Sequence, residues 1–382
     1  MAKKDTRPTQ TKKKSEGKRR EEHEIVLICN PQAGGRWKEL AAILDSREAR
    51  NVRRIVTDSV DDIGPALATI GRGAQLVCIY GGDGTIQRLL DRMLLETHKT
   101  PPQLAFIGGG TMNVTARWCG FVGSPGSNFR QIVRAYSSGE LLLKEVPLLR
   151  VVAGDTTHLG FTFGSGVPVR ILNAYENGSK GKLAALGMAL GWVSALWTHF
   201  PRTFESMLTD MPAEVVVDGE PLPYQRYGLA FCNVTGRINR GVEPFVKQRT
   251  RDTFFYAAYA ISLREASVLL PLLARGIRPI DPKSLLQHVS AWRQAVLSLR
   301  AEGLLPADPR YVNDLARSVE IKSPEALYTV DGELFHNADT ELPIRVDLGP
   351  RLRLAVSSTV GLHPTVRLAA EVGGGMTEQL RR

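Results

Sequence analysis

The glycine-rich turn at 81–85 constrains the fold of this chain more than any other segment. An apolar run, 76–80, leads directly into Gly81-Gly82-Asp83-Gly84-Thr85, and an amphipathic run, 86–95, follows it. A strand, a glycine turn and a helix in that order bring backbone N–H groups up to a phosphate. The carboxylate of Asp83 would repel a phosphate there unless it handles a metal ion or takes a proton. The turn therefore indicates chemistry at a phosphate rather than simple adhesion to one.

The residues around this turn repeat a strand–turn–helix pattern. Apolar runs at 25–29, 52–56, 76–80 and 103–107 are typical of strands, and a helical pattern follows most of them. Repeated βα units predict a parallel sheet with helices on both faces. Ligands on such sheets bind beyond the carboxyl ends of the strands. The turns that fall there contain Asn30-Pro31 with Gly34, Thr57, Gly81–Thr85 and Gly108–Thr111.

The sequence pattern changes after about residue 146. Short β-like runs recur from 148 to 356, which predicts an antiparallel β domain, here expected to be a β-sandwich. Helical segments near 180–200 and over 264–317 interrupt it. The apolar run 183–197 is shorter than the roughly twenty residues that span a bilayer. We therefore expect a basic disordered tail (1–23), an α/β nucleotide-binding domain (24–146), a β-rich acceptor domain (147–365) and a flexible tail (366–382).

The 382 residues are 43% hydrophobic and carry a formal net charge of +10, and much of that charge lies at the N-terminus. Nine of the first twenty residues are Lys or Arg, with almost no apolar side chain among them, which is typical of disorder. The tail is either simply solvated or attracted to anionic lipid headgroups, each nearby cation contributing about 1 kcal/mol. No aromatic residues interleave with the charges, so we expect no nucleic-acid partner.

Cysteine spacing and the N-terminal pattern indicate the compartment. Cys29, Cys78, Cys119 and Cys232 are far apart in sequence, with no C-x-x-C pair, as expected for buried thiols in a reducing compartment. The basic tail is not followed by the apolar segment of a secretory signal. We therefore expect a cytoplasmic protein. A peripheral position on the inner face of the membrane is compatible with this location.

Two acidic motifs are candidates for chemistry. Asp83 either caps the following helix or acts at a phosphate, and we favour the second because the glycines and Thr85 already form the turn. Asp331-Gly332-Glu333 lies between two β-like runs, where Asp-Gly predicts a hairpin. This tripeptide either serves only as the hairpin turn or brings two carboxylates to a cleft beside the phosphate-binding turns. Asp218-Gly219-Glu220 is a near copy, so the tripeptide alone is a weak signal.

Taken together, the motifs resemble the diacylglycerol kinase/sphingosine kinase family of lipid kinases. The resemblance rests on Asn30-Pro31-x-x-Gly34, Gly81–Thr85, Gly110-Thr111-x-Asn113 and Val330-Asp331-Gly332-Glu333, in that order, and spans about 25 to 357. The first glycine motif is shared with NAD kinases, whereas the late hairpin and the β domain favour the lipid kinases. Gly160-Phe161-x-Phe163-Gly164 is similar to a glycine-rich segment of the family.

The resemblance implies an ATP-dependent kinase that uses Mg²⁺ and phosphorylates a hydroxyl of a membrane lipid of the diacylglycerol, sphingoid base or ceramide type. It implies catalytic roles for Asp83, Asp331 and Glu333, with Asp331 as the preferred general base. Asp83 and Asp252 are the implied metal residues. The implied ATP-binding residues are Asn30, Pro31, Gly34, Thr57, Gly81, Gly82, Asp83, Gly84, Thr85, Gly110, Thr111 and Asn113.

Two alternatives to a lipid kinase remain open, and a departure from the family pattern motivates the second of them. Val114 stands where many diacylglycerol kinase-like members have Asp, although sphingosine kinase-like members carry an apolar residue there. The alternatives are a small-molecule kinase of the NAD kinase type and a lipid- or nucleotide-binding homologue with impaired catalysis. The sequence leaves open the acceptor lipid, its acyl chains and the oligomeric state, including a homodimer.

Overall fold

A computed structural model describes residues 24–357 except 34, 60–61, 71–73, 97–100, 111–112, 122, 177–208, 238–241, 282, 284–290 and 302–304. The basic tail, the final tail, Gly34, Thr111 and the apolar run 183–197 therefore lie outside the described residues. The described N-terminal elements are β1 (Ile25–Cys29), α1 (Trp37–Leu44), η1 (Arg47–Ala49), β2 (Val52–Val56), α2 (Ile63–Thr69), β3 (Leu76–Gly81), α3 (Asp83–Asp91), η2 (Arg92–Glu96), β4 (Gln103–Gly108), α4 (Val114–Trp118) and α5 (Pro125–Ser137).

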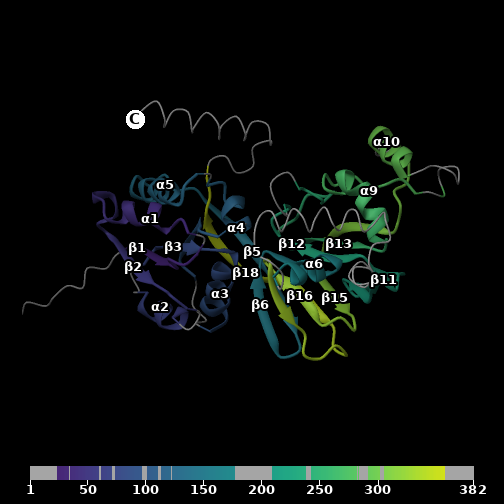
Figure 1. The fold of residues 1–382 in the computed structure, drawn as a ribbon, viewed down its shortest axis with the longest axis horizontal. Coiled ribbons are helices and arrows are strands. Elements are labelled where there is room, and N and C mark those ends of the chain that lie inside the picture. Colours follow the sequence, from purple (N-terminus) through teal and green to yellow (C-terminus); the bar gives the residue numbers. More distant parts are fainter. Residues whose placement is uncertain are drawn as a thin grey trace, which may run out of the picture.

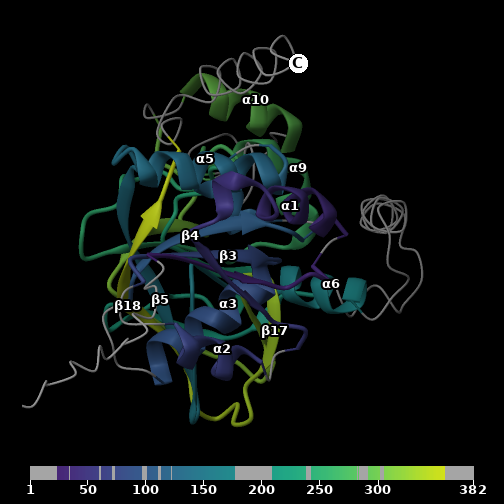
Figure 2. The same cartoon turned by 90° about the vertical axis from the view of Figure 1, so that its left-hand side faces the viewer.

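The four predicted N-terminal strands form a parallel sheet in the order β4-β3-β1-β2. Every residue of β1 and β3 is buried, as their continuous apolar runs require of strands covered on both faces. Helices α1 and α5 cover one face, and α2 and α3 cover the other (Figures 1 and 2). The predicted parallel α/β half is confirmed.

The second half of the chain is mainly β. Its described elements are β5 (Leu143–Ala153), β6 (Thr156–Gly160), β7 (Thr162–Gly166), α6 (Val167–Glu176), β8 (Met211–Pro212), β9 (Glu214–Val217), β10 (Glu220–Pro221), β11 (Arg226–Tyr227), β12 (Leu229–Asn233), β13 (Phe254–Tyr259), α9 (Leu263–Leu273), α10 (Ala291–Ala301), β14 (Tyr311–Ala316), β15 (Ser318–Lys322), β16 (Leu327–Val330), β17 (Glu333–His336) and β18 (Ile344–Ala355).

The long strand β18 joins the two halves. It pairs in parallel with β4 at Leu354↔Leu104 and antiparallel with β5 and β15, so that one ten-stranded mixed sheet runs through the molecule. A separate six-stranded antiparallel sheet has the order β14-β13-β12-β7-β16-β17. The mixed fold with separate antiparallel sheets agrees with the predicted class. The division near residue 146 stays a prediction, since strands from both sides of it share the larger sheet.

The helical stretch expected over 264–317 ends earlier than predicted. Helices α9 and α10 lie within it, but Tyr311–Ala316 form β14 and pair with β13. Pro306 and Pro309 prevent a helix from continuing towards this segment. In β14, Tyr311, Asn313 and Ala316 are buried against the neighbouring strand, which stabilises the extended conformation.

Candidate active site between the glycine turns and the late hairpin

The predicted turns converge because the parallel strands end at one edge of the sheet. Backbone bonds continue the ladder past the strands, from Asn30 N to Tyr80 O (3.1 Å), from Thr57 N to Cys29 O (2.9 Å) and from Gly109 N to Gly81 O (2.8 Å). The Tyr80 hydroxyl donates to Ala33 O at 3.1 Å, which ties the turn after β1 to β3. The residues predicted around Asn30, Thr57, Gly81 and Gly110 therefore share one edge.

The two glycine-rich turns pack backbone against backbone. A Cβ built on Gly110 would lie 2.8 Å from the Cα of Gly82, so a side chain at 110 requires one turn to move. Beside them, Asn113 adopts a left-handed conformation (φ 50°), and its amide donates to Gly110 O at 2.5 Å. Its Oδ1 is buried without a hydrogen-bond partner, which is the kind of acceptor that a bound N–H or O–H group satisfies.

Asp83 joins the first glycine turn to the start of α4. Its carboxylate accepts hydrogen bonds from the backbone N–H groups of Val114 (3.1 Å) and Thr115 (3.2 Å). Burial raises the pKa of Asp83, and these backbone bonds act in the opposite direction. The carboxylate therefore has a structural task besides any chemical one. Because Val114 contributes through its backbone, the missing Asp at this position does not remove the contact.

The late Asp-Gly turn is a hairpin, as predicted, and it reaches the first glycine turn. Asp331 (φ 51°) and Gly332 (φ 89°) both have positive φ and connect β16 to β17. The carboxylate carbon of Glu333 would lie 2.5 Å from a Cβ built on Gly84. Glycine at 84 is therefore the residue that lets the Glu333 carboxylate approach α3.

Asp331 is held by backbone donors from the turn between β6 and β7. Phe161 N donates to Oδ1 (2.9 Å) and Oδ2 (3.0 Å), and Thr162 N donates to Oδ1 (2.9 Å). Burial raises the pKa of Asp331 to about 8; the Phe161 N–H group opposes the rise, and the negative charge of Asp83 adds to it. A carboxylate with such a pKa is suited to take a proton near neutral pH.

Three residues that the sequence motifs did not indicate hold the hairpin to α3. Arg88 pairs with Glu333 (Nη2 to Oε2, 3.1 Å), and Asp91 accepts from Leu159 N (2.6 Å) and contacts His158 Nδ1 (3.0 Å). The His158 ring stacks on Phe335 of β17, with ring centroids 3.8 Å apart. Helical spacing offered a signal for Arg88 and Asp91, because Gly84, Arg88 and Asp91 follow one another at i, i+4 and i+7.

Asp252 does not join this group. Its side chain is 81% exposed and pairs with Arg351 at 3.5 Å (Nη2 to Oδ1). Among the residues that the structure describes, no cluster of three or more His, Cys, Asp or Glu side chains is arranged to hold a metal. The metal role of Asp252 stays a prediction.

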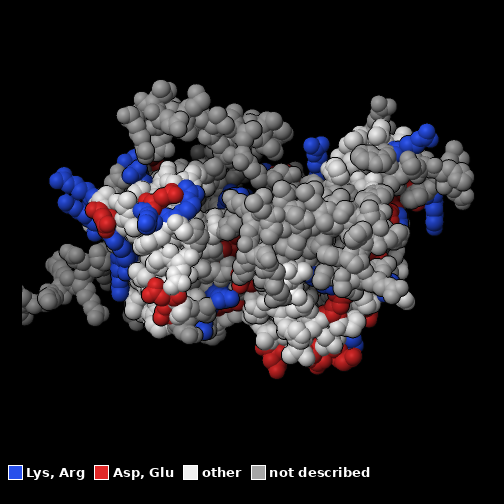
Figure 3. Space-filling model, in the orientation of Figure 1, with Lys and Arg blue, Asp and Glu red and all other residues white. Residues whose placement is uncertain are grey.

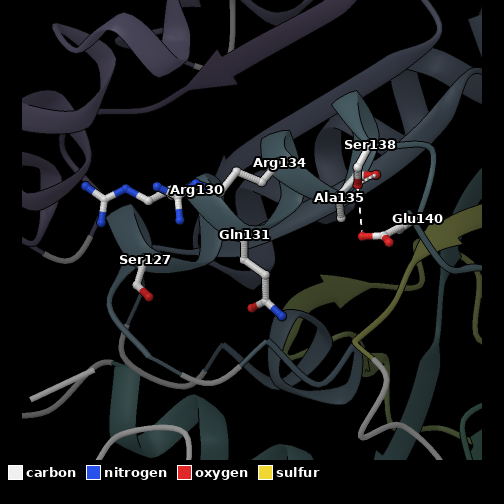
Figure 4. A pocket seen from close by; sticks show the side chains of 7 residues that line it. All are labelled: Ser127, Arg130, Gln131, Arg134, Ala135, Ser138 and Glu140. Carbon is white, nitrogen blue, oxygen red and sulfur yellow. Dashed lines mark hydrogen bonds between the residues drawn. The ribbon is translucent and has the colours of Figure 1, made fainter. Parts of the chain in front are cut away.

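A separate hollow of about 600 Å³ lies on α5 and the turn after it (Figure 4). None of the predicted site residues lines it. Its lining residues are Ser127, Arg130, Gln131, Arg134, Ala135, Ser138 and Glu140. The glycine turns and the hairpin, rather than this hollow, therefore define the candidate active site.

Replacing Arg88 with Ala tests the link between α3 and the hairpin. Arg88 and Glu333 are 46% and 31% exposed, so we expect the pair to contribute at most about 1 kcal/mol to stability. If Arg88 orients Glu333, turnover in the kinase reaction that the resemblance implies should fall about five-fold in Arg88→Ala. This factor corresponds to about 1 kcal/mol. Lys322→Ala is the control, because Lys322 is equally exposed and pairs with Glu341 at 3.2 Å. Equal turnover in both variants would exclude an orienting role for Arg88.

Comparisons with known proteins show what the chain is similar to. Residues 24–140 match the family model described as "Diacylglycerol kinase catalytic domain". The match confirms the resemblance over these residues. Two solved structures described as "a putative diacylglycerol kinase from Bacillus anthracis str. Sterne" match 88% of this chain and 98% of their own, with 16% and 17% identity and a TM-score of 0.56 each.

A third solved structure, of a protein described as a diacylglycerol kinase from the same strain, has 14% identity and a TM-score of 0.54, with the same coverage. These likenesses show that the fold is shared along most of the chain. No curated protein matches the chain. The described helices include none that is both long and apolar enough to cross a membrane.

Proposed function

We propose that this chain is an ATP-dependent lipid kinase that transfers the γ-phosphate to a hydroxyl of a membrane lipid. The observation that carries the proposal is the meeting of the late hairpin with the first glycine turn. Glu333 lies against Gly84, and the negative charge of Asp83 contributes to the raised pKa of Asp331. A phosphate-binding turn that faces a poised carboxylate is the arrangement that phosphoryl transfer to an alcohol needs.

The nucleotide would lie along the edge formed by the glycine turns. The backbone N–H groups of Gly82, Gly84 and Thr85 stand at the start of α3, where the helix dipole favours phosphate. The buried, unpartnered Oδ1 of Asn113 fits a nucleotide donor beside them. The turn after β1 and the neighbouring Thr57 would complete the nucleotide side, although the Thr57 side chain is only 2% exposed and makes a long bond to Cys29 O (3.4 Å).

Mg²⁺ in nucleotide sites usually takes one or two carboxylates together with phosphate oxygens and water. The Asp83 carboxylate would be such a ligand, because it lies at the start of α3 and its oxygens, which accept bonds from Val114 N and Thr115 N, keep further lone pairs. When bound, the ion would neutralise charge that develops on the phosphates. Asp331 would take the proton of the acceptor hydroxyl as the hydroxyl oxygen attacks the γ-phosphorus. The bond from the γ-phosphorus to the β,γ-bridging oxygen would break, and ADP would leave. Glu333 would orient the acceptor hydroxyl.

The acceptor would be a lipid of the diacylglycerol, sphingoid base or ceramide type, met at a membrane surface by a cytoplasmic protein. Transfer of labelled γ-phosphate from ATP tests this directly. We expect a labelled product with at least one lipid from a panel of diacylglycerol, monoacylglycerol, sphingoid base and ceramide when Mg²⁺ is present. Phosphorylation of NAD with no lipid product would contradict the proposal, and ATP binding without transfer to any acceptor would favour an impaired homologue.

A further inference from the structure

Among the side chains of α10 that the structure describes, the buried ones are polar, and the exposed ones are apolar except for Arg293. Gln294 and Ser298, one turn apart, are 8% and 1% exposed. The Gln294 amide donates to Ile280 O at 2.8 Å, and Ile280 N donates to Ser298 Oγ at 3.3 Å. Val296 (48% exposed) and Leu299 (54% exposed) lie on the opposite side of the helix. This is the reverse of the pattern that water alone would select.

The exposed apolar side chains of the described residues concentrate in this region. Nine large hydrophobic residues are exposed, and five of them lie on α9, on α10 or just after α10. We call these five the apolar face: Leu270, Val296, Leu297, Leu299 and Leu305. Single exposed apolar residues are ordinary, but a group of them marks a surface that binds a partner or a membrane.

Cations outnumber acids in the segment that carries the apolar face. Residues 264–301 contain six Lys or Arg and only two acids, Glu265 and Asp281. Glu265 is engaged with Arg310 at 2.7 Å, and Asp281 accepts from Lys283 N at 3.0 Å. Exposed cations of this segment are Arg275, Arg278, Lys283 and Arg293. Figure 3 shows blue side chains around α10, whereas red side chains gather along the opposite, lower edge of the same half.

From this arrangement we propose that α9 and α10 form a membrane-docking surface, with the apolar face entering the headgroup region of an anionic bilayer and the cations of the same segment contacting its lipids. The proposal rests on the proposed function in that a lipid kinase must meet its acceptor at a bilayer. Apolar side chains rimmed by Lys and Arg are the composition that binds such interfaces.

The charges favour a bilayer over a second copy of the chain as the occupant. A two-fold dimer places the same patch of both subunits face to face. Arg275, Arg278 and Lys283 would then approach their own copies, and like charges that meet across an interface are costly. An anionic bilayer instead presents negative headgroups, which attract these three cations.

Vesicle co-sedimentation of the full-length chain tests the surface without any turnover. The variant Val296→Gln with Leu299→Gln removes apolar area while keeping residues that favour a helix. We expect its partition onto vesicles of phosphatidylcholine and phosphatidylglycerol to fall about ten-fold or more. Leu342→Gln is the matched control, because Leu342 is 50% exposed but lies next to Glu341, and its binding should equal that of the wild type.

A second variant addresses the cations. Arg275→Gln with Arg278→Gln should lower binding to the anionic vesicles several-fold, with little change on vesicles of phosphatidylcholine alone. The basic tail is present in every protein compared, so its contribution is common to all. Circular dichroism of each variant verifies that the helices are retained.

Equal binding of the wild type and both variants would overturn the proposal, as would a dimer in light scattering that the Val296/Leu299 variant abolishes while vesicle binding is unchanged. Failure of the proposed function would look different. A chain that binds vesicles through α10 but phosphorylates no lipid keeps the docking surface and loses the kinase assignment. Loss of vesicle binding with full turnover on a short-chain, water-soluble acceptor is the outcome we expect for the Val296/Leu299 variant.

Discussion

Replacing Asp331 with Asn is expected to lower lipid kinase turnover by about 10²–10⁴-fold, the range that a positioned general base contributes. The fold should survive the change. Asn accepts a left-handed backbone, and its Oδ1 can keep the bonds from Phe161 N and Thr162 N, both of which reach Oδ1 of Asp331. What is lost is the capacity to take a proton. Turnover at saturating ATP, with circular dichroism as a check on folding, measures the effect.

The near-copy hairpin provides a matched control within the same chain. Asp218 has nearly the same conformation (φ 50°), and its Oδ1 accepts from the backbone N–H groups of Arg317 and Ser318, both at 2.8 Å. It is exposed and lies in the β9–β10 turn. Asp218→Asn should therefore leave turnover unchanged. An equal loss in the two variants would show that the hairpin conformation matters and that proton transfer by Asp331 does not.

The raised pKa of Asp331 gives a second measurement. Only the ionised carboxylate can take a proton, so turnover should rise with pH up to about 8 and then level off. The free energy of unfolding should change in the opposite direction and fall as pH rises. The folded state holds this proton up to about pH 8, whereas the unfolded carboxyl releases it in the ordinary range of Asp, so unfolding becomes easier as pH rises between those values. Both trends should disappear in Asp331→Asn.

Gly84→Ala is expected to lower turnover by about two orders of magnitude, because misplacement of catalytic groups by about 1 Å costs roughly that factor. A Cβ at 84 would lie 2.5 Å from the carboxylate carbon of Glu333. The Glu333 side chain would have to move, which breaks its pair with Arg88 and displaces it from the glycine turn. Since the end of that side chain can move, we expect stability to change far less than turnover.

Gly64→Ala is the matched control for this change. Gly64 lies in helix α2, and a Cβ there would be 3.7 Å from Arg92 Nη1, an ordinary contact. Ala in a helix is favoured over Gly by about 1 kcal/mol, so this variant should be at least as stable as the wild type and fully active. Full activity of Gly84→Ala would mean that Glu333 has no role at the glycine turn.

The local elements of this fold could be predicted from sequence because their signals are local. The run Ile25–Cys29 is a strand with the predicted bounds, and Asp331-Gly332 forms the predicted hairpin. The convergence of the turns followed from a general property of parallel sheets, whose ligand-binding turns share one edge. These inferences require no knowledge of contacts between distant residues.

The contacts between residues far apart in sequence could not be predicted in the same way. Nothing near Glu333 in sequence indicates that its carboxylate meets Gly84, nor that β18 would lie beside β4. Likewise, Tyr311–Ala316 becomes a strand because β13 is available to pair with it. The hydrogen bonds that the backbone at the start of α4 donates to Asp83 depend on how the two glycine turns pack, which is a property of the folded chain.

The most direct test of the proposed function is the transfer of labelled γ-phosphate from ATP to lipid by the wild type and Asp331→Asn, side by side, with Mg²⁺ and with ATP binding measured in both. We predict a labelled lipid with the wild type and at most about one hundredth of it with the variant, at equal ATP affinity. Transfer to lipid that is undiminished in Asp331→Asn, or a wild type that binds ATP and labels no lipid, would contradict it.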